Sequence, residues 1–392
     1  MSASLPRPQP IRTDTSNDFG HDTMLRRLPG IFRDTAARNP DYPPGIRDAL
    51  ERLASDLESD RPILMLDRPA PDYDDWRAAW EPHAGDTWQN TVWFFAETYA
   101  YRQVIQAVRW WETGRDPFAP MKTDEYGSAA PWQLLEKTLA APGGREDRLL
   151  TLFAGALWGN RIDLSMVESM AHGSESVAAD DWLVDDRAAV IDHLLRAPGG
   201  DVHFINDNTG SELIHDLALA GALLDGLAGR VILHVKLHPT YISDAVPADV
   251  LWLVGELAGG AHGAGAAQLG RQLQAAFEAG RLRLAPDLFW NSSRYLWELP
   301  PRLRAGFDGA RLVIVKGDAN YRRMVGDALW PPATPFAEVV GYFPAPVVAL
   351  RALKSDAVCG LADGLAERLA AANPRWSSIG RYGVVQARLV VP

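Results

Sequence analysis

The chain has 392 residues, 47% of them hydrophobic and 23% charged, which is enough apolar material for a sizeable globular core. Its net charge of −11 argues against binding nucleic acid through a broadly basic surface. The sequence has no apolar run of about 18 residues, its first residues lack the apolar stretch of a secretory signal, and Cys359 is its only cysteine. We therefore expect no membrane span, no internal disulfide and a reducing, cytoplasmic location.

The N-terminal third is predicted to be helical. Residues 1–21 are polar and rich in proline, which is typical of a flexible arm. Over residues 22–145, apolar side chains recur at three- and four-residue spacing, as in Leu50, Leu53 and Leu57. The seven tryptophans of this region are expected to pack in its core rather than to line a ligand surface.

Residues 146–392 show a different pattern, in which short runs rich in Val and Ile alternate with amphipathic helices. Strands are predicted at 202–205, 231–235, 282–285, 312–315, 347–350 and 384–390, and helices at 212–224, 250–257, 266–279, 361–371 and from about 321. This alternation predicts an α/β domain with a mostly parallel sheet that is covered on both faces.

Polar segments directly follow four of these predicted strands. They are 206–212 (NDNTGSE), 236–244 (KLHPTYISD), 316–323 (KGDANYRR) and 351–356 (RALKSD). Any one of them could be an ordinary turn or helix cap. Four in one sheet point to a site, because ligands of such sheets bind beyond the carboxyl ends of the strands.

The residue types at these strand ends favour phosphoryl transfer assisted by a metal. Carboxylate and amide oxygens without cysteine suit a divalent cation such as Mg²⁺ or Mn²⁺. Lysines and arginines at the same edge, with the N-terminus of the helix after Gly210, suit a phosphoryl group. Glu212, one helical turn beyond Asp207 and Asn208, either orients a water molecule or only complements the positive end of its helix.

Three of these motifs resemble those of the DUF89 damage-control phosphatases, in the branch named for the acidic residue methyltransferase 1 protein. They are 207–212 (DNTGSE), 239–244 (PTYISD) and 316–322 (KGDANYR). Segments 93–102 (WFFAETYAYR) and 157–165 (LWGNRIDLS) are similar to that branch too, so the resemblance covers most of the chain.

The resemblance implies an α/β/α sandwich with a helical N-terminal region packed against it. It also implies hydrolysis of phosphate monoesters of small metabolites, typically sugar phosphates, with Mn²⁺, Co²⁺, Ni²⁺ or Mg²⁺. The metal ligands of the family fall on Asp207, Asn208 and Asp244, of which the first two would also touch substrate. The further residues assigned to substrate, or to water beside it, are Asp318, Asn320, Tyr321, Arg322, Lys354, Arg351, Lys316, Lys236, Glu212, Asn160 and Asp163.

One motif departs from the branch pattern. Where the branch has Arg-Thr-x-Lys near the C-terminus, this chain has Arg351-Ala352-Leu353-Lys354. The alanine removes a hydroxyl contact, which bears on substrate preference more than on the phosphatase chemistry.

Several alternatives stay open at this stage. The nucleophile is either a water molecule on the metal or the carboxylate of Asp207. A methyltransferase that uses S-adenosylmethionine needs a glycine-rich loop after a strand, but the loop after the first predicted strand offers only Gly210, and the glycines of 259–265 follow a helix. A module that binds sugar phosphates without catalysis would keep the cations but would not need the metal ligands. The oligomeric state is not predicted.

Overall fold

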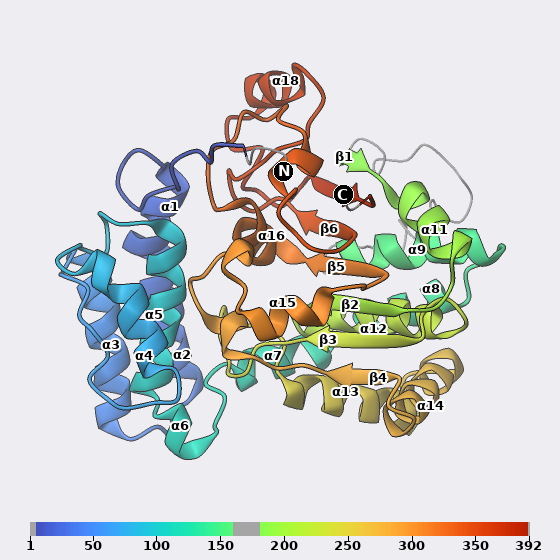
Figure 1. The fold of residues 1–392 in the computed structure, drawn as a ribbon. Coiled ribbons are helices and arrows are strands. Elements are labelled where there is room, and N and C mark those ends of the chain that lie inside the picture. Colours follow the sequence, from blue (N-terminus) through green and yellow to red (C-terminus); the bar gives the residue numbers. More distant parts are fainter. Residues whose placement is uncertain (1–4, 160–180, 391–392) are drawn as a thin grey trace.

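The computed structural model describes residues 5–159 and 181–390, which form a group of N-terminal helices beside a seven-stranded sheet (Figure 1). The N-terminal helices are α1 (Asp18–Asp22), a π-helical turn (Thr23–Arg27), α2 (Leu28–Arg38), α3 (Pro44–Glu58), α4 (Tyr73–Trp80), α5 (Trp93–Ala107), α6 (Trp110–Thr113) and α7 (Ala119–Tyr126). No helix in the described part of the chain is long and apolar enough to cross a membrane.

The N-terminal helices form because their apolar residues share one face. In α3, Leu50, Leu53 and Leu57 follow the predicted helical spacing and are buried. Helix α5 is buried on nearly all sides, since it lies between α3 and the body that contains the sheet. Helices α1 to α5 lie on one side of the sheet, drawn in blue in Figure 1.

The sheet has the strand order β1-β7-β6-β5-β2-β3-β4. Its strands are β1 (Trp182–Asp185), β2 (Asp201–Ile205), β3 (Arg230–His234), β4 (Leu282–Leu284), β5 (Leu312–Lys316), β6 (Val347–Ala352) and β7 (Gly383–Arg388). Strands β4, β3, β2, β5 and β6 are parallel, whereas β7 is antiparallel to β6, and β1 runs parallel to β7. The prediction of a mostly parallel sheet is confirmed.

Helices cover both faces of the sheet. They are α8 (Ala130–Leu139), α9 (Arg145–Trp158), α11 (Arg187–Arg196), α12 (Gly210–Leu224), α13 (Pro247–Gly259), α14 (Ala264–Glu278), α15 (Pro301–Phe307), α16 (Gly317–Val325), α17 (Phe336–Val339) and α18 (Leu365–Ala372). Alternate residues of β5 enter two separate cores: Val313 and Val315 join the core shared with the N-terminal helices, and Leu312 and Ile314 join the core around α12. This is the expected α/β/α arrangement.

The structure differs from the sequence predictions in three respects. The N-terminal arm is held from Pro10 on, where Ile11 exchanges backbone hydrogen bonds with Asp327 and Trp93, and the Ile11 side chain is 3% exposed. Strand β1 and helices α9, α11, α15 and α17 were not predicted. Helix α8 falls within residues 22–145, yet its Trp132 belongs to the core around α12.

The close contact between α13 and α14 gives a test of the packing. A Cβ atom added to Gly270 would lie 2.2 Å from the backbone nitrogen of Ala258. We expect Gly270→Ala to lower the free energy of unfolding by about 2 kcal/mol, because the two helices must separate. Gly255 on the exposed side of α13 has no neighbour within 4 Å, so Gly255→Ala should raise stability by about 0.5–1 kcal/mol. Urea unfolding of both variants measures the difference, and equal values would contradict this packing.

Candidate functional site

The predicted metal ligands lie at the strand of the sheet from which the chain continues to opposite sides. The chain passes from β2 to β3 on one side, whereas β5 lies on the other side of β2, so a crevice is expected beyond the carboxyl ends of β2 and β5. A small pocket occupies this place. It is lined by Asp207, Asn208, Glu212, Gly317, Asp318, Lys354, Leu157, Trp158, Leu350 and Ala352. The structure therefore brings together residues from three of the four predicted strand ends.

The loop after β3 supplies Asp244 from beside this pocket. Asn208 and Asp244 form a short antiparallel bridge: the Ala245 amide donates to the Asp207 carbonyl at 2.8 Å, and the Thr209 amide donates to Ser243 at 2.6 Å. The three predicted ligands are thus carried by two loops that are hydrogen-bonded to each other.

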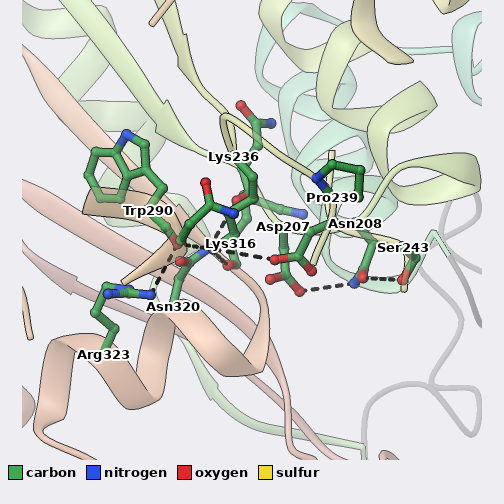
Figure 2. A network of polar contacts seen from close by, with 12 residues as sticks. Asp207, Asn208, Lys236, Pro239, Ser243, Trp290, Lys316, Asn320 and Arg323 are labelled. Carbon is green, nitrogen blue, oxygen red and sulfur yellow. Dashed lines mark hydrogen bonds and ion pairs between the residues drawn. The ribbon is translucent and has the colours of Figure 1, made fainter. Parts of the chain in front are cut away.

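Hydrogen bonds also orient the Asn208 side chain. Its Nδ2 donates to Asp207 Oδ2 at 2.9 Å, and Ser243 Oγ donates to its Oδ1 at 2.6 Å (Figure 2). The same Nδ2 also donates to Glu212 Oε2 at 3.0 Å. Glu212, a weaker prediction from sequence, therefore holds a predicted metal ligand in place.

The two carboxylates of this group are buried and not fully paired. Burial raises the pKa of Asp207 well above its usual range, and the charges of Asp244 and Glu212 raise it further. Burial also raises the pKa of Asp244 to about 6, although Lys236 Nζ lies 3.3 Å from its Oδ2 and opposes the shift. Oδ1 of Asp207 accepts no hydrogen bond from the described residues. A divalent cation would satisfy such an oxygen.

The donor set of this group is two carboxylates and one amide. Within residues 5–159 and 181–390, no cluster of three or more His, Cys, Asp or Glu side chains is arranged to hold a metal ion. Asp207, Asn208 and Asp244 still fit a hard cation, because an amide oxygen completes the two carboxylates and the Asp207 oxygen is unpaired.

Lys316, predicted to clamp phosphate, is instead used inside the protein. Its ammonium group lies 3.0 Å from Glu212 Oε1 and 2.9 Å from Asp216 Oδ1, and it also donates to the Ala156 carbonyl. Burial raises the pKa of Asp216 to about 7 even beside this lysine. Lys316 is 1% exposed, so it acts on the pocket through Glu212.

Gly317 allows the end of β5 to approach Asp207. A Cβ atom at Gly317 would lie 1.9 Å from Asp207 Oδ2, and its φ of +79° is one that glycine adopts readily. Only glycine permits both the conformation and the approach.

Asp318 organises the segment that carries Lys354. One oxygen of Asp318 accepts hydrogen bonds from Arg351 Nε at 2.7 Å, from the Lys354 amide at 3.0 Å and from Ser355 Oγ at 3.1 Å. The buried Arg351 thereby links β6 to this loop, while the Lys354 side chain is exposed at the pocket. Ala352 also lines the pocket, so the departure from the branch motif lies at the site.

Three further residues predicted to touch substrate are buried in other contacts. Asn320 Nδ2 donates to the carbonyls of Asn206 and Lys316. The Tyr321 hydroxyl donates to Gln386 Oε1 at 3.0 Å.

Arg322 is the third of these residues. It pairs with Glu97 at 2.6 Å and with Asp327 at 2.7 Å, and its guanidinium group lies 3.6 Å from the centre of the Trp93 ring. None of Asn320, Tyr321 and Arg322 lines the pocket. Asn160 and Asp163 lie outside the described residues.

Glu125 and Tyr126, at the end of α7, were missed from sequence. The Ser211 amide donates to Glu125 Oε1 at 2.9 Å, and the Gly210 amide donates to the Tyr126 hydroxyl at 2.8 Å. These amides belong to the first turn of α12, the helix N-terminus that is predicted from sequence to bind a phosphoryl group. No local signal could have revealed the contact, because the partners are 84 and 86 residues apart.

Comparison with known proteins gives consistent matches across the chain. Residues 23–369 match the family model described as the damage-control phosphatase ARMT1-like domain. The chain is similar to proteins named damage-control phosphatase ARMT1. The zebrafish (Danio rerio) protein is 29% identical over 97% of this chain and 96% of its own length, and the mouse (Mus musculus) protein is 30% identical over 93% and 91%. The human (Homo sapiens) protein is 27% identical over 93% and 91%.

A solved structure supports the fold. The crystal structure of a DUF89 family protein from Pyrococcus horikoshii aligns with a TM-score of 0.50 at 14% identity, covering 96% of this chain and 99% of the other. At this identity the match bears on the fold alone.

The contact of Glu125 with α12 gives a second test. Glu125→Gln keeps an oxygen for the Ser211 amide but removes a negative charge beside the first turn of α12. We expect inorganic phosphate to bind roughly threefold more tightly, about 0.65 kcal/mol, in calorimetric titration. Glu136 is the matched control, because its carboxylate accepts from the amides of Gly265 and Ala266 at the start of α14, away from the pocket. Glu136→Gln should leave phosphate affinity unchanged, and equal effects of the two variants would contradict the prediction.

Proposed function

We propose that this chain, which belongs to the damage-control phosphatase ARMT1-like family and is therefore a phosphatase, hydrolyses sugar phosphates with a divalent cation held by Asp207, Asn208 and Asp244. The observation that carries the proposal is the buried Oδ1 of Asp207, which has no hydrogen-bond partner among residues 5–159 and 181–390 and lies beside two further oxygen donors. Mn²⁺, Co²⁺, Ni²⁺ and Mg²⁺ all suit oxygen donors, and the residues do not distinguish them. A divalent cation bound there supplies positive charge that polarises the phosphoryl group.

The chain's own residues keep the site in shape. Lys316 fixes Glu212, Glu212 fixes the amide of Asn208, and the loop bridge fixes Asp244 relative to both. The exposed ammonium group of Lys354, at the pocket, is placed to pair with a phosphoryl oxygen. The nucleophile is either a water molecule or the Asp207 carboxylate, as the sequence left open.

Methyl transfer with S-adenosylmethionine is not supported. The family is named for phosphatase activity. The glycines of 259–265 connect α13 to α14, so they do not form a cofactor loop after a strand. We also place the protein in a reducing, cytoplasmic compartment, on the ground that its single cysteine, Cys359, is buried and free.

The ligand set is tested by removing one carboxylate at a time. Asp207→Ala and Asp244→Ala should each lower kcat on a panel of sugar phosphates by about a thousandfold. Both should also weaken Mn²⁺ binding in calorimetric titration, which needs no turnover. Asp201→Ala is the control, because Asp201 lies at the opposite end of β2 and pairs with Arg230 at the surface. The proposed site is wrong if the Asp207 variant keeps full activity.

Chelation separates a phosphatase from a module that only binds sugar phosphates. Treatment with EDTA should abolish turnover, and added Mn²⁺ should restore it, because the unpaired Asp207 oxygen needs a cation. Phosphate release is the measurement. Turnover that survives EDTA would exclude the metal.

The approach of Gly317 to Asp207 gives a further test. Gly317→Ala should abolish turnover, because the new methyl group displaces the Asp207 carboxylate. Gly309 is the matched control: its φ is +76°, yet nothing lies within 4 Å of a Cβ atom there. Gly309→Ala should cost about 1 kcal/mol of stability from the same backbone strain and should retain kcat. Comparable losses of kcat in both variants would show that strain, not displacement, is responsible.

A further inference from the structure

A second cavity lies on the other side of Tyr126 from the catalytic pocket. It is an open cavity bordered by α6, α7, α8, α13 and the loop after β3, has a volume of about 670 Å³, and shares no lining residue with the catalytic pocket. This volume falls in the range of small-molecule binding sites. Nothing in the phosphatase chemistry accounts for it.

Four aromatic side chains line this cavity: Trp110, Tyr126, Trp132 and Trp252. The ring centres of Tyr126 and Trp252 lie 4.6 Å apart, and those of Tyr126 and Trp132 lie 6.4 Å apart. Trp252 is 46% exposed although it is large and apolar. The sequence predicted that the tryptophans of the N-terminal third pack in the core, and Trp132 is buried. Trp110 and Trp132 nevertheless also line this cavity.

The charges of the lining select the kind of ligand. Asp116, Asp249 and Glu256 carry three negative charges against the one positive charge of Lys122, a net charge of −2 for these four side chains, and His262 Nε2 lies 3.4 Å from Glu256 Oε2. Lys122 is shared between Asp116 at 2.9 Å and Asp249 at 2.8 Å, so together the three leave one negative charge uncompensated. A phosphate or carboxylate would be repelled. Aromatic faces beside carboxylates are the environment that binds ammonium groups through cation–π attraction.

We propose that this cavity binds an organic cation, in which an ammonium group is joined to a flat apolar body. The apolar body stacks on Trp252 and Tyr126, and the ammonium group pairs with Glu256, because Asp249 is already held by Lys122 and by the Val246 amide. The ligand is not the phosphorylated substrate, because the charge of the lining excludes a phosphoryl group.

The cavity also borders the loops of the catalytic pocket. Lys122 Nζ donates to the Asp244 carbonyl at 3.2 Å, and the Tyr126 hydroxyl accepts from the Gly210 amide at 2.8 Å. Neither side chain lines the catalytic pocket. Binding in this cavity is therefore best measured directly and not through turnover, so that its outcome is independent of the proposed phosphatase site.

The test uses three indoles of similar shape and different charge at pH 7.5: tryptamine (cation), tryptophol (neutral) and indole-3-propionate (anion). In calorimetric titration we expect tryptamine to bind at least about tenfold more tightly than indole-3-propionate, with tryptophol between them. Glu256→Gln should reduce this ratio while leaving tryptophol unchanged. Equal binding of the three indoles, or no binding of tryptamine, would overturn the proposal.

A pair of neighbouring variants on α13 locates the binding. Trp252→Ala should weaken tryptamine binding by about tenfold, because it removes an aromatic wall. Leu251→Ala is the control, since Leu251 is 56% exposed on the same helix and does not line the cavity. Unchanged affinity in Trp252→Ala would overturn the proposal. A second result would also overturn it: Trp252→Ala elutes later than the unchanged protein in size-exclusion chromatography, and neither protein binds tryptamine. That result would show that this face is a contact between copies of the chain.

Discussion

The buried ammonium group of Lys316 is the contact on which the arrangement of the site depends. It joins the last residue of β5 to the carboxylates of Glu212 and Asp216 on α12, and it lies where solvent cannot replace it. Glu212 in turn accepts a hydrogen bond from Asn208. Lys316 therefore positions Asn208 through Glu212, although Lys316 itself does not line the pocket. A buried charge of this kind adds little net stability while its partners are present, but its loss leaves two carboxylates uncompensated.

In the segment 316–322, only some residues of the sequence motif line the pocket. Gly317 and Asp318 line the pocket, whereas Tyr321 and Arg322 are turned into the protein. Arg322 pairs with Glu97 of α5 and so fastens the N-terminal helices to the sheet. The motif therefore combines residues that shape the pocket with residues that hold the two halves of the molecule together.

The sequence predicted the parallel strands well, and the structure places a pocket at the strand ends that it singled out, because both depend on local patterns. The period of the apolar residues reveals a strand or helix, and parallel strands end at one edge of a sheet. What it missed depends on pairing between distant segments. The N-terminal arm looked flexible because its partner Asp327 is remote in the chain, and the same distance hid the contact of Glu125 with Ser211. Strand β1 is short, and its neighbour β7 comes 200 residues later.

The bridge between Asn208 and Asp244 has a consequence for metal selectivity. Two backbone hydrogen bonds already fix the spacing of the loops that carry the proposed ligands, so little conformational entropy is lost when a cation binds. A cation bound by the proposed ligands would therefore meet two loops whose spacing is already set. Discrimination between cations then rests on ionic radius and preferred coordination geometry, more than on the number of donors the protein can gather.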